Sequence, residues 1–233
     1  MKDAFVSRES LDRLVTRWAT DRRVFVPVTF DIMNHEETPD YELVRDKVPG
    51  TVTLHGAAPA HTPKSFLFYA REVVATYPGA PAEATVEAPP TVLVGPRACD
   101  LAALRKYDKV YWSTKHFTEE YDDPFYIEKR ERTLIVSLDC TAPKETCFCT
   151  KVGGKPHPDD GFDLNLSPVE GGFIVTVGSA KGEKLLEGAD NLLTAVSAEH
   201  RSERERTRRS VAEAVDRQNA KFEMDGPPDA YDL

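Results

Sequence analysis

The sequence of 233 residues lacks the features that mark membrane-spanning and secreted proteins. No stretch approaches the roughly eighteen apolar residues that a membrane-spanning helix needs, and the N-terminus, MKDAFVSRE, contains no apolar core of a secretory signal. Positive charge is also in short supply. The 30 Lys and Arg residues against 39 Asp and Glu give a net charge of −9, which argues against binding to nucleic acid or anionic membranes. These absences predict a cytoplasmic chain without a membrane span.

A glycine-rich dinucleotide motif and internal repeats are missing as well. The pair Gly153-Gly154 does not follow a predicted strand with the G-x-G-x-x-G spacing that cradles a pyrophosphate. We therefore expect any flavin or nicotinamide to be bound by another subunit.

Cysteine is scarce, and the four cysteines present are unevenly placed. Cys140, Cys147 and Cys149 fall within ten residues of one another, and Cys99 lies about forty residues before them. In a cytoplasmic chain such a group more often binds metal or carries out redox chemistry than forms disulfides. Four thiols match one iron–sulfur cluster or one tetrahedral zinc ion. The spacing alone leaves both open, together with a reactive thiol.

Two short apolar segments predict the part of the fold that would hold these cysteines. Residues 91–95 (TVLVG) and 133–138 (TLIVSL) are typical of buried strands, and a helix-forming stretch separates them. Such an order favours a parallel pair in an α/β sheet, with sites at the carboxyl ends of the strands. Because Cys99 and Cys140 each follow one of these strands, we expect them to lie close together.

The remaining patterns predict a mixed sheet with flanking helices, an α/β (α+β) fold. We expect helices at 10–20, 66–77, 184–186 and 191–222, an edge strand at 24–28, a short strand at 51–54 within a loop region at 34–64, and a hairpin of 162–166 with 173–177. Proline at position 27 is the reason for the edge assignment. The predicted organisation is one α/β domain with the four-cysteine site at 1–190, a helical segment at 191–224 and a tail at 225–233.

The segments around the cysteines resemble a known family of electron-transfer proteins. They are GPRACDLAAL at 95–104 (similar to GVRPCDLAAL in the family), TLIV at 133–136 leading to Asp139-Cys140, TCFCT at 146–150 and GFDL at 161–164. The family includes the beta subunit of cytosolic sulfhydrogenase, the corresponding iron–sulfur subunit of anaerobic sulfite reductase, and iron–sulfur subunits of heterodisulfide-reductase-like complexes. The motifs cover roughly residues 60 to 190.

This resemblance implies an electron-transfer component that has no catalytic residue of its own. Cys99, Cys140, Cys147 and Cys149 would ligate an iron–sulfur cluster, with [4Fe–4S] favoured over [2Fe–2S]. The implied partners are hydrogenase or reductase subunits, including one that binds flavin or nicotinamide. The alternative is a zinc-stabilised interaction module without redox activity. A thiol enzyme that uses Cys147 or Cys149 ranks last, because no histidine is near them in sequence.

Residues beside the cysteines are candidates for secondary roles at the site. Arg97 would offset the negative charge of the thiolates and the cluster, and Asp100 flanks Cys99. For Asp100 and Asp139 we favour helix capping or turn hydrogen bonds over a role in the chemistry. His116 and His157 are possible alternative ligands, but histidines in such segments more often lie at the surface without a function.

One departure from the family concerns the C-terminal part of the sequence. Members typically continue into a ferredoxin-like module that binds two [4Fe–4S] clusters through cysteine-rich runs, and no such run is present up to Leu233. We expect this chain either to be a truncated or split member or to represent the N-terminal domain.

Overall fold

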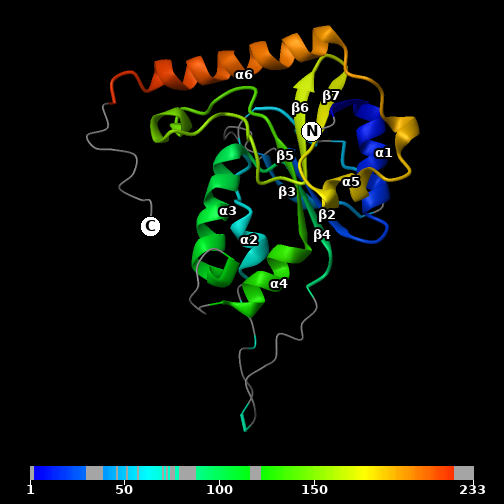
Figure 1. The fold of residues 1–233 in the computed structure, drawn as a ribbon, viewed down its shortest axis with the longest axis vertical. Coiled ribbons are helices and arrows are strands. Elements are labelled where there is room, and N and C mark those ends of the chain that lie inside the picture. The colour runs from blue at the N-terminus through cyan, green and yellow to red at the C-terminus, as the bar shows by residue number, and fades with distance from the viewer. Residues whose placement is uncertain are drawn as a thin grey trace.

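The computed structural model describes residues 3–29, 39–45, 47–50, 52–56, 58–69, 71, 73, 77–78, 88–115 and 122–222. These residues form a seven-stranded sheet with helices on both faces and one long helix across an end (Figure 1). The strands are β1 (Asp3–Ser7), β2 (Arg23–Thr29), β3 (Pro39–Leu43), β4 (Thr91–Val94), β5 (Thr133–Leu138), β6 (Leu164–Val169) and β7 (Gly172–Val177). The α-helices are α1 (Arg8–Trp18), α2 (Lys64–Leu67), α3 (Ala98–Tyr111), α4 (Pro124–Arg132), α5 (Ala180–Leu186) and α6 (Ala198–Gln218).

The sheet is mixed, with a parallel centre and antiparallel margins. Its strand order is β1-β7-β6-β5-β4-β2-β3. Strands β2, β4, β5 and β6 run parallel, whereas β3 pairs antiparallel with β2, and β7 pairs antiparallel with both β6 and β1. The parallel pair of β4 and β5 is the one predicted from their apolar sequences. The predicted mixed α/β sheet with flanking helices and a long C-terminal helix is confirmed.

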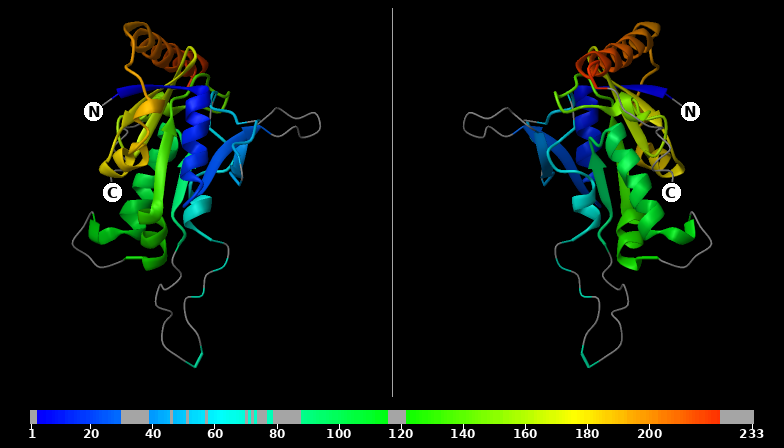
Figure 2. Two further views of the ribbon diagram at one scale, coloured as in Figure 1. Left: turned by 90° about the vertical axis from the view of Figure 1, so that its right-hand side faces the viewer. Right: turned by 90° about the vertical axis from the view of Figure 1, so that its left-hand side faces the viewer.

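Alternate residues of the central strands supply two cores, one on each face of the sheet. Val92 and Val94 of β4 belong to the core that α1 and α5 cover, whereas Leu93 belongs to the core beneath α2, α3 and α4. Figure 2 shows these two groups of helices on opposite sides of the sheet. Burial on both faces explains why β4 and β5 are apolar at nearly every position.

Helix α1 forms as its sequence predicts. Ser7 is the N-cap, and its hydroxyl accepts a hydrogen bond from the amide of Ser10 at 3.1 Å. The apolar positions at helical spacing, including Leu11 and Leu14, are buried. Trp18 closes the helix against α5 by donating its indole N–H to the carbonyl of Leu185 at 2.9 Å.

Strand β2 and its neighbour β3 differ from the prediction. Proline in β2 predicts an edge strand, but β2 is paired on both sides. The pairing with β4 ends at Phe25, so Pro27, which has no N–H, lies beyond the positions where β4 would need a donor. Residues 39–43, expected as a loop, form β3 at the sheet margin. Of the short strand expected at 51–54, Val52 forms an isolated bridge to Val28, and Thr51 lies outside the described residues.

Of the helix predicted at 66–77, only residues 66 and 67 are helical among the described residues, and residues 70, 72 and 74–76 lie outside them. Helix α2 ends at Leu67, and Phe68 adopts an extended backbone conformation with φ −117° and ψ 102°. In this conformation the Phe68 ring packs against Tyr107, Tyr111 and Tyr126, with ring centroids 4.9 to 5.7 Å apart. Packing of aromatic rings from α3 and α4 therefore overrides the local helical spacing.

The C-terminal elements largely follow the prediction. Strands β6 and β7 form the expected hairpin, whose turn includes Gly171 with a φ of +74°. The long helix α6 begins at Ala198, later than the predicted 191, because residues 190–192 form a separate 3-10 turn. The predicted tail at 225–233 lies outside the described residues. Within the described part of the chain, no helix is long and apolar enough to cross a membrane.

Candidate functional site

The four cysteines line one cavity at the carboxyl ends of the parallel strands. The cavity has a volume of about 550 Å³ and is bounded by the first turns of α3, the segment after β5, and the loop that follows it. Cys99 lies in the first turn of α3, Cys140 follows β5, and Cys147 and Cys149 lie on the loop. All four are free thiols. The start of α3 and the segment of residues 140–149, about forty residues apart in sequence, thus bring four sulfur atoms to one cavity.

The pairing of β4 with β5 brings Cys99 and Cys140 together. Beyond the strands this pairing continues, since the amide of Gly95 donates to the carbonyl of Val136 at 2.8 Å and the amide of Leu138 donates to that of Pro96 at 2.9 Å. The two chain segments therefore leave the sheet side by side, one into α3 and the other into Cys140. The predicted proximity of Cys99 and Cys140 is present in the structure as a shared cavity.

Short backbone hydrogen bonds shape the loop that carries Cys147 and Cys149. The amide of Cys147 donates to the carbonyl of Lys144 at 2.9 Å, and the amide of Lys144 lies 3.3 Å from the Cys147 sulfur. Cys149 begins a 3-10 turn (Cys149–Val152), which ends at Gly153, whose φ of +74° suits glycine. A Cβ on Gly154 would lie 3.0 Å from the carbonyl oxygen of Cys149, so the turn has little room for a side chain there.

Burial raises the pKa values of Cys140 and Cys99. Desolvation raises the pKa of Cys140 to about 12, although the nearby Arg97 guanidinium acts in the opposite direction. Cys99 is open to the cavity, yet desolvation by the surrounding protein, followed by the charge of Asp100, raises its pKa to about 11. The negative charges that Cys147 and Cys149 carry when deprotonated raise both pKa values further. Binding of a metal would therefore release protons.

Arg97 is buried directly behind the cysteines. Its side chain is almost wholly enclosed and donates to the carbonyl of Asp139 at 2.8 Å and to those of Leu138 and His55 at 3.3 Å. Desolvation lowers the pKa of Arg97, while the charge of Cys140 is the largest influence that raises it. The guanidinium thus places a positive charge next to the thiols and fixes the backbone that leads into Cys140.

The two aspartates beside the cysteines have structural partners. A carboxylate oxygen of Asp100 accepts a hydrogen bond from the amide of Arg97 at 2.8 Å, as expected for a residue that caps the start of α3. Asp139 is only 2 % exposed, and its carboxylate accepts hydrogen bonds from Asn165, Ser167 and Arg208 at 2.7 to 2.9 Å. The contact of Asp139 with Arg208 of α6 was not predicted. Arg208 lies within a run of mixed charges, which is typical of a solvated helix face.

His157 was expected on a surface loop, but it lines the cysteine cavity. It follows Pro156, whose carbonyl accepts a hydrogen bond from the amide of Cys140 at 2.9 Å. Its Nδ1 is buried and has no hydrogen-bond partner within the described part of the chain, and burial lowers the pKa of the imidazole. His116 lies outside the described residues.

A single ion and a cluster need different spacings of their sulfur ligands. A tetrathiolate zinc ion needs sulfur atoms about 3.8 Å apart, from Zn–S bonds of about 2.3 Å and tetrahedral angles. Among the residues that the structure describes, no three His, Cys, Asp or Glu side chains are grouped closely enough to hold a metal ion. The four thiols share one cavity, and by number and chemical type they suit a zinc ion as well as an iron–sulfur cluster. In an iron–sulfur cluster the several iron atoms separate the cysteine ligands more widely than a single zinc ion does.

Comparison with known proteins finds a relative for part of the chain. The chain is 37 % identical over 95 residues to a protein named sulfhydrogenase 2 subunit beta from Pyrococcus furiosus. The matched residues make up 41 % of this chain and 26 % of that protein, so the chain spans about a quarter of the relative's length. No model of a known protein family matches the chain, and no solved structure does. Over this part of its length, the chain is homologous to a sulfhydrogenase beta subunit, as its sequence motifs predict.

Proposed function

We propose that this chain is a cytoplasmic electron-transfer component that holds one iron–sulfur cluster through Cys99, Cys140, Cys147 and Cys149. The observation that carries the proposal is the convergence on one cavity of four thiols from two parts of the chain, the start of α3 and residues 140–149. The name of the relative, a sulfhydrogenase beta subunit, supports a place in a redox complex with hydrogenase or reductase subunits. A subunit that binds flavin or nicotinamide would be a further partner.

The residues of the cavity suit this role. When bound, the cluster would supply reversible one-electron transfer, with [4Fe–4S] favoured over [2Fe–2S]. Arg97 would offset the negative charge of the thiolates and the cluster, and the first turn of α3, which lines the cavity, adds the positive end of a helix dipole. Asp100 holds the start of α3 and thereby Cys99. Burial of Cys140 would limit access of water on the inner side of the site.

A zinc-stabilised interaction module is the second candidate, because four thiols match the ligand number of one zinc ion as well as that of one cluster. The name of the relative, a sulfhydrogenase beta subunit, makes the electron-transfer component the stronger candidate. The two candidates differ in composition and colour, which one experiment measures.

The test is anaerobic purification followed by visible spectroscopy and analysis of iron, sulfide and zinc. We expect a brown protein with about four iron and four sulfide per chain. Cys147→Ser should lose most of the colour, whereas Thr146→Ala, which changes the neighbouring cavity residue and keeps all four thiols, should retain it. A colourless protein with one zinc per chain would overturn the proposal in favour of the scaffold, and full colour in Cys147→Ser would remove that ligand.

A further inference from the structure

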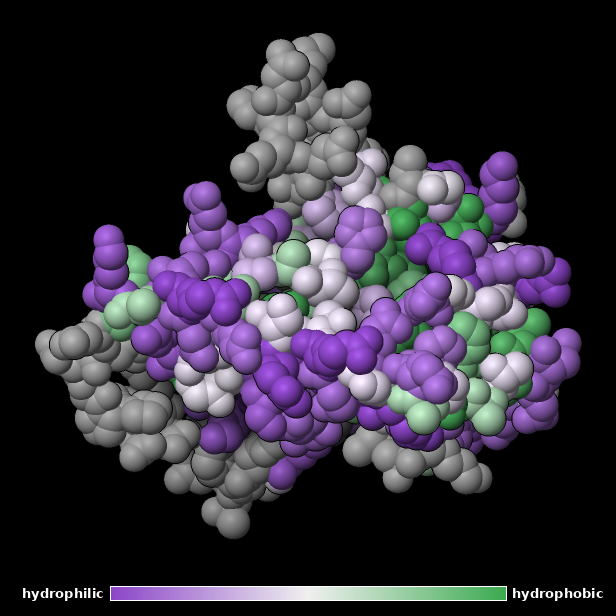
Figure 3. Space-filling view, turned by 90° about the horizontal axis from the view of Figure 1, so that it is seen from above, coloured by the Kyte–Doolittle hydropathy of each residue, from purple (hydrophilic) through white to green (hydrophobic). Residues whose placement is uncertain are grey.

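Helix α6 binds the rest of the molecule largely through polar contacts. The helix has 21 residues, and only Val211 and Val215 are buried along it. Figures 1 and 2 show it lying across the end of the sheet, above the loop of the cysteine site. Seen from above, this face of the molecule is mostly hydrophilic (Figure 3). Directional contacts therefore fix where α6 lies.

One such contact reaches the residue before Cys140. The Nε atom of Arg208 lies 2.8 Å from the buried carboxylate of Asp139. The main-chain carbonyl of Asp139 is in turn held by Arg97 at 2.8 Å. Through Arg208, helix α6 thus binds the segment that leads from β5 into the cavity.

A second contact reaches Cys147 at the other end of the cavity. The side-chain amide of Gln218 donates to the carbonyls of Cys147 at 2.7 Å and Lys144 at 2.9 Å. The side-chain amide of Asn219, which is buried, donates to the same carbonyl of Cys147 at 2.8 Å and to that of Val215 at 2.8 Å. Two side-chain amides from the end of the helix therefore bind the carbonyl oxygen of Cys147, a predicted ligand.

We propose that α6 positions the cluster ligands, with Arg208, Gln218 and Asn219 as positioning residues. This inference rests on the proposed function, because its consequence is that α6 helps the chain to retain the cluster. Its physical basis is that a ligand loop fixed from outside loses less conformational freedom when the metal binds. Because α6 touches both cysteine segments, it sets the position of Cys147 relative to Cys140. Helix α6 is therefore part of the ligand-binding site.

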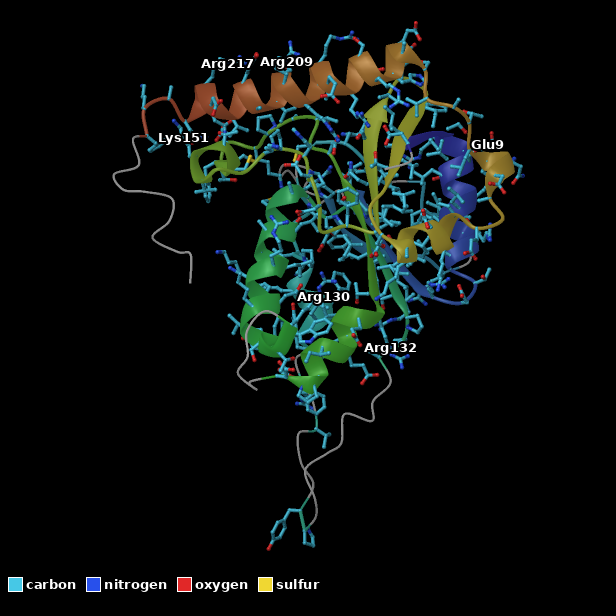
Figure 4. All side chains as sticks on the ribbon, viewed as in Figure 1. Glu9, Arg130, Arg132, Lys151, Arg209 and Arg217 are labelled. Atoms are coloured by element: carbon cyan, nitrogen blue, oxygen red, sulfur yellow. The ribbon has the colours of Figure 1, made fainter. Side chains whose placement is uncertain are left out.

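The test uses the full chain with Gln218→Met, Asn219→Ala and the double variant. Gln218 is exposed, and methionine keeps its length while removing both donors, so this variant does not depend on tolerance of a core change. Arg217→Met is the matched control, since Arg217 lies on the side of α6 that faces away from the loop (Figure 4). Two properties are measured: the rate of iron loss to excess chelator without oxygen, and amide hydrogen exchange in the metal-free protein.

We expect the double variant to lose iron about 10 to 100 times faster than the wild type, the range typical of changes to residues that support metal ligands. Exchange at the amides of Cys147 and Gly154 should also rise, while the control matches the wild type in both assays. Iron loss within about twofold of the wild type, with unchanged exchange, would overturn the role of α6. If the wild type holds no iron, the proposed function fails, and hydrogen exchange alone still decides whether α6 positions the loop.

Discussion

The ion pair between Arg208 and Asp139 gives a quantitative test of how α6 is attached. Arg208→Met removes the cation that contacts this carboxylate and leaves it with the neutral donors Asn165 and Ser167. Removing one member of a buried pair typically costs about 3 to 5 kcal/mol. The Arg208 side chain is 18 % exposed, so water screens part of the interaction, and we take the lower end, about 3 kcal/mol.

This loss is large for a protein of this size. Domains typically unfold with a free energy of about 5 to 15 kcal/mol, and 1 kcal/mol shifts Tm by about 2 to 4 °C at this length. We therefore expect Tm of the metal-free Arg208→Met protein to fall by about 6 to 12 °C. The assay is thermal and urea unfolding followed by circular dichroism.

The control is Arg201→Met on the same helix. Arg201 pairs with Asp3 at 2.9 Å, but its side chain is 49 % exposed, so we expect a loss below about 1 kcal/mol. The double variant Arg208→Met/Asp139→Asn should be less destabilised than the sum of the single variants, because no unpaired charge remains buried. A loss for Arg208→Met as small as that for Arg201→Met would refute the reasoning.

Two further predictions concern the cavity. The pKa values of Cys140 and Cys99 in the folded, metal-free protein, about 12 and 11, exceed the ordinary value of 9.0, so the folded state holds these protons after the unfolded chain has released them. Stability should therefore fall as pH rises from about 9 to about 12. In Cys140→Ser the urea midpoint should decline less over this pH range than in the wild type. An equal decline would contradict the raised pKa of Cys140. His157→Ala should keep its full iron content if four thiolates are the ligands; loss of iron, with imidazole restoring it, would make His157 a ligand.

The sequence predicts the centre of the sheet well because its strands are buried on both faces. Such strands are apolar at successive positions, and Thr91–Val94 and Thr133–Leu138 are recognisable for that reason. The parallel pairing then brings Cys99 and Cys140 to one edge. Strand β3 was missed because it lies at the margin and contains Pro39 and polar residues, which are typical of loops.

Long-range contacts account for the rest of what the sequence did not reveal. Helical spacing predicted a helix through Phe68, but aromatic rings from α3 and α4 draw this residue into an extended conformation. Gln218 and Asn219 resemble any polar end of a helix, and only the folded chain brings their amides to Cys147. Spacing along a chain reports which face of a helix is apolar, whereas hydrogen bonds to a distant loop leave no periodic signal.

The position of Asp139 explains why the two experiments on α6 are needed together. Its carboxylate binds Arg208, its carbonyl binds Arg97, and the next residue is Cys140. A change at Arg208 therefore alters the stability of the fold and the geometry of the site at once. Gln218 is exposed and contacts the loop through carbonyl oxygens, so its substitution acts on the loop with little cost in stability. Faster iron loss in Gln218→Met at unchanged Tm would thus separate positioning of the ligands from support of the fold.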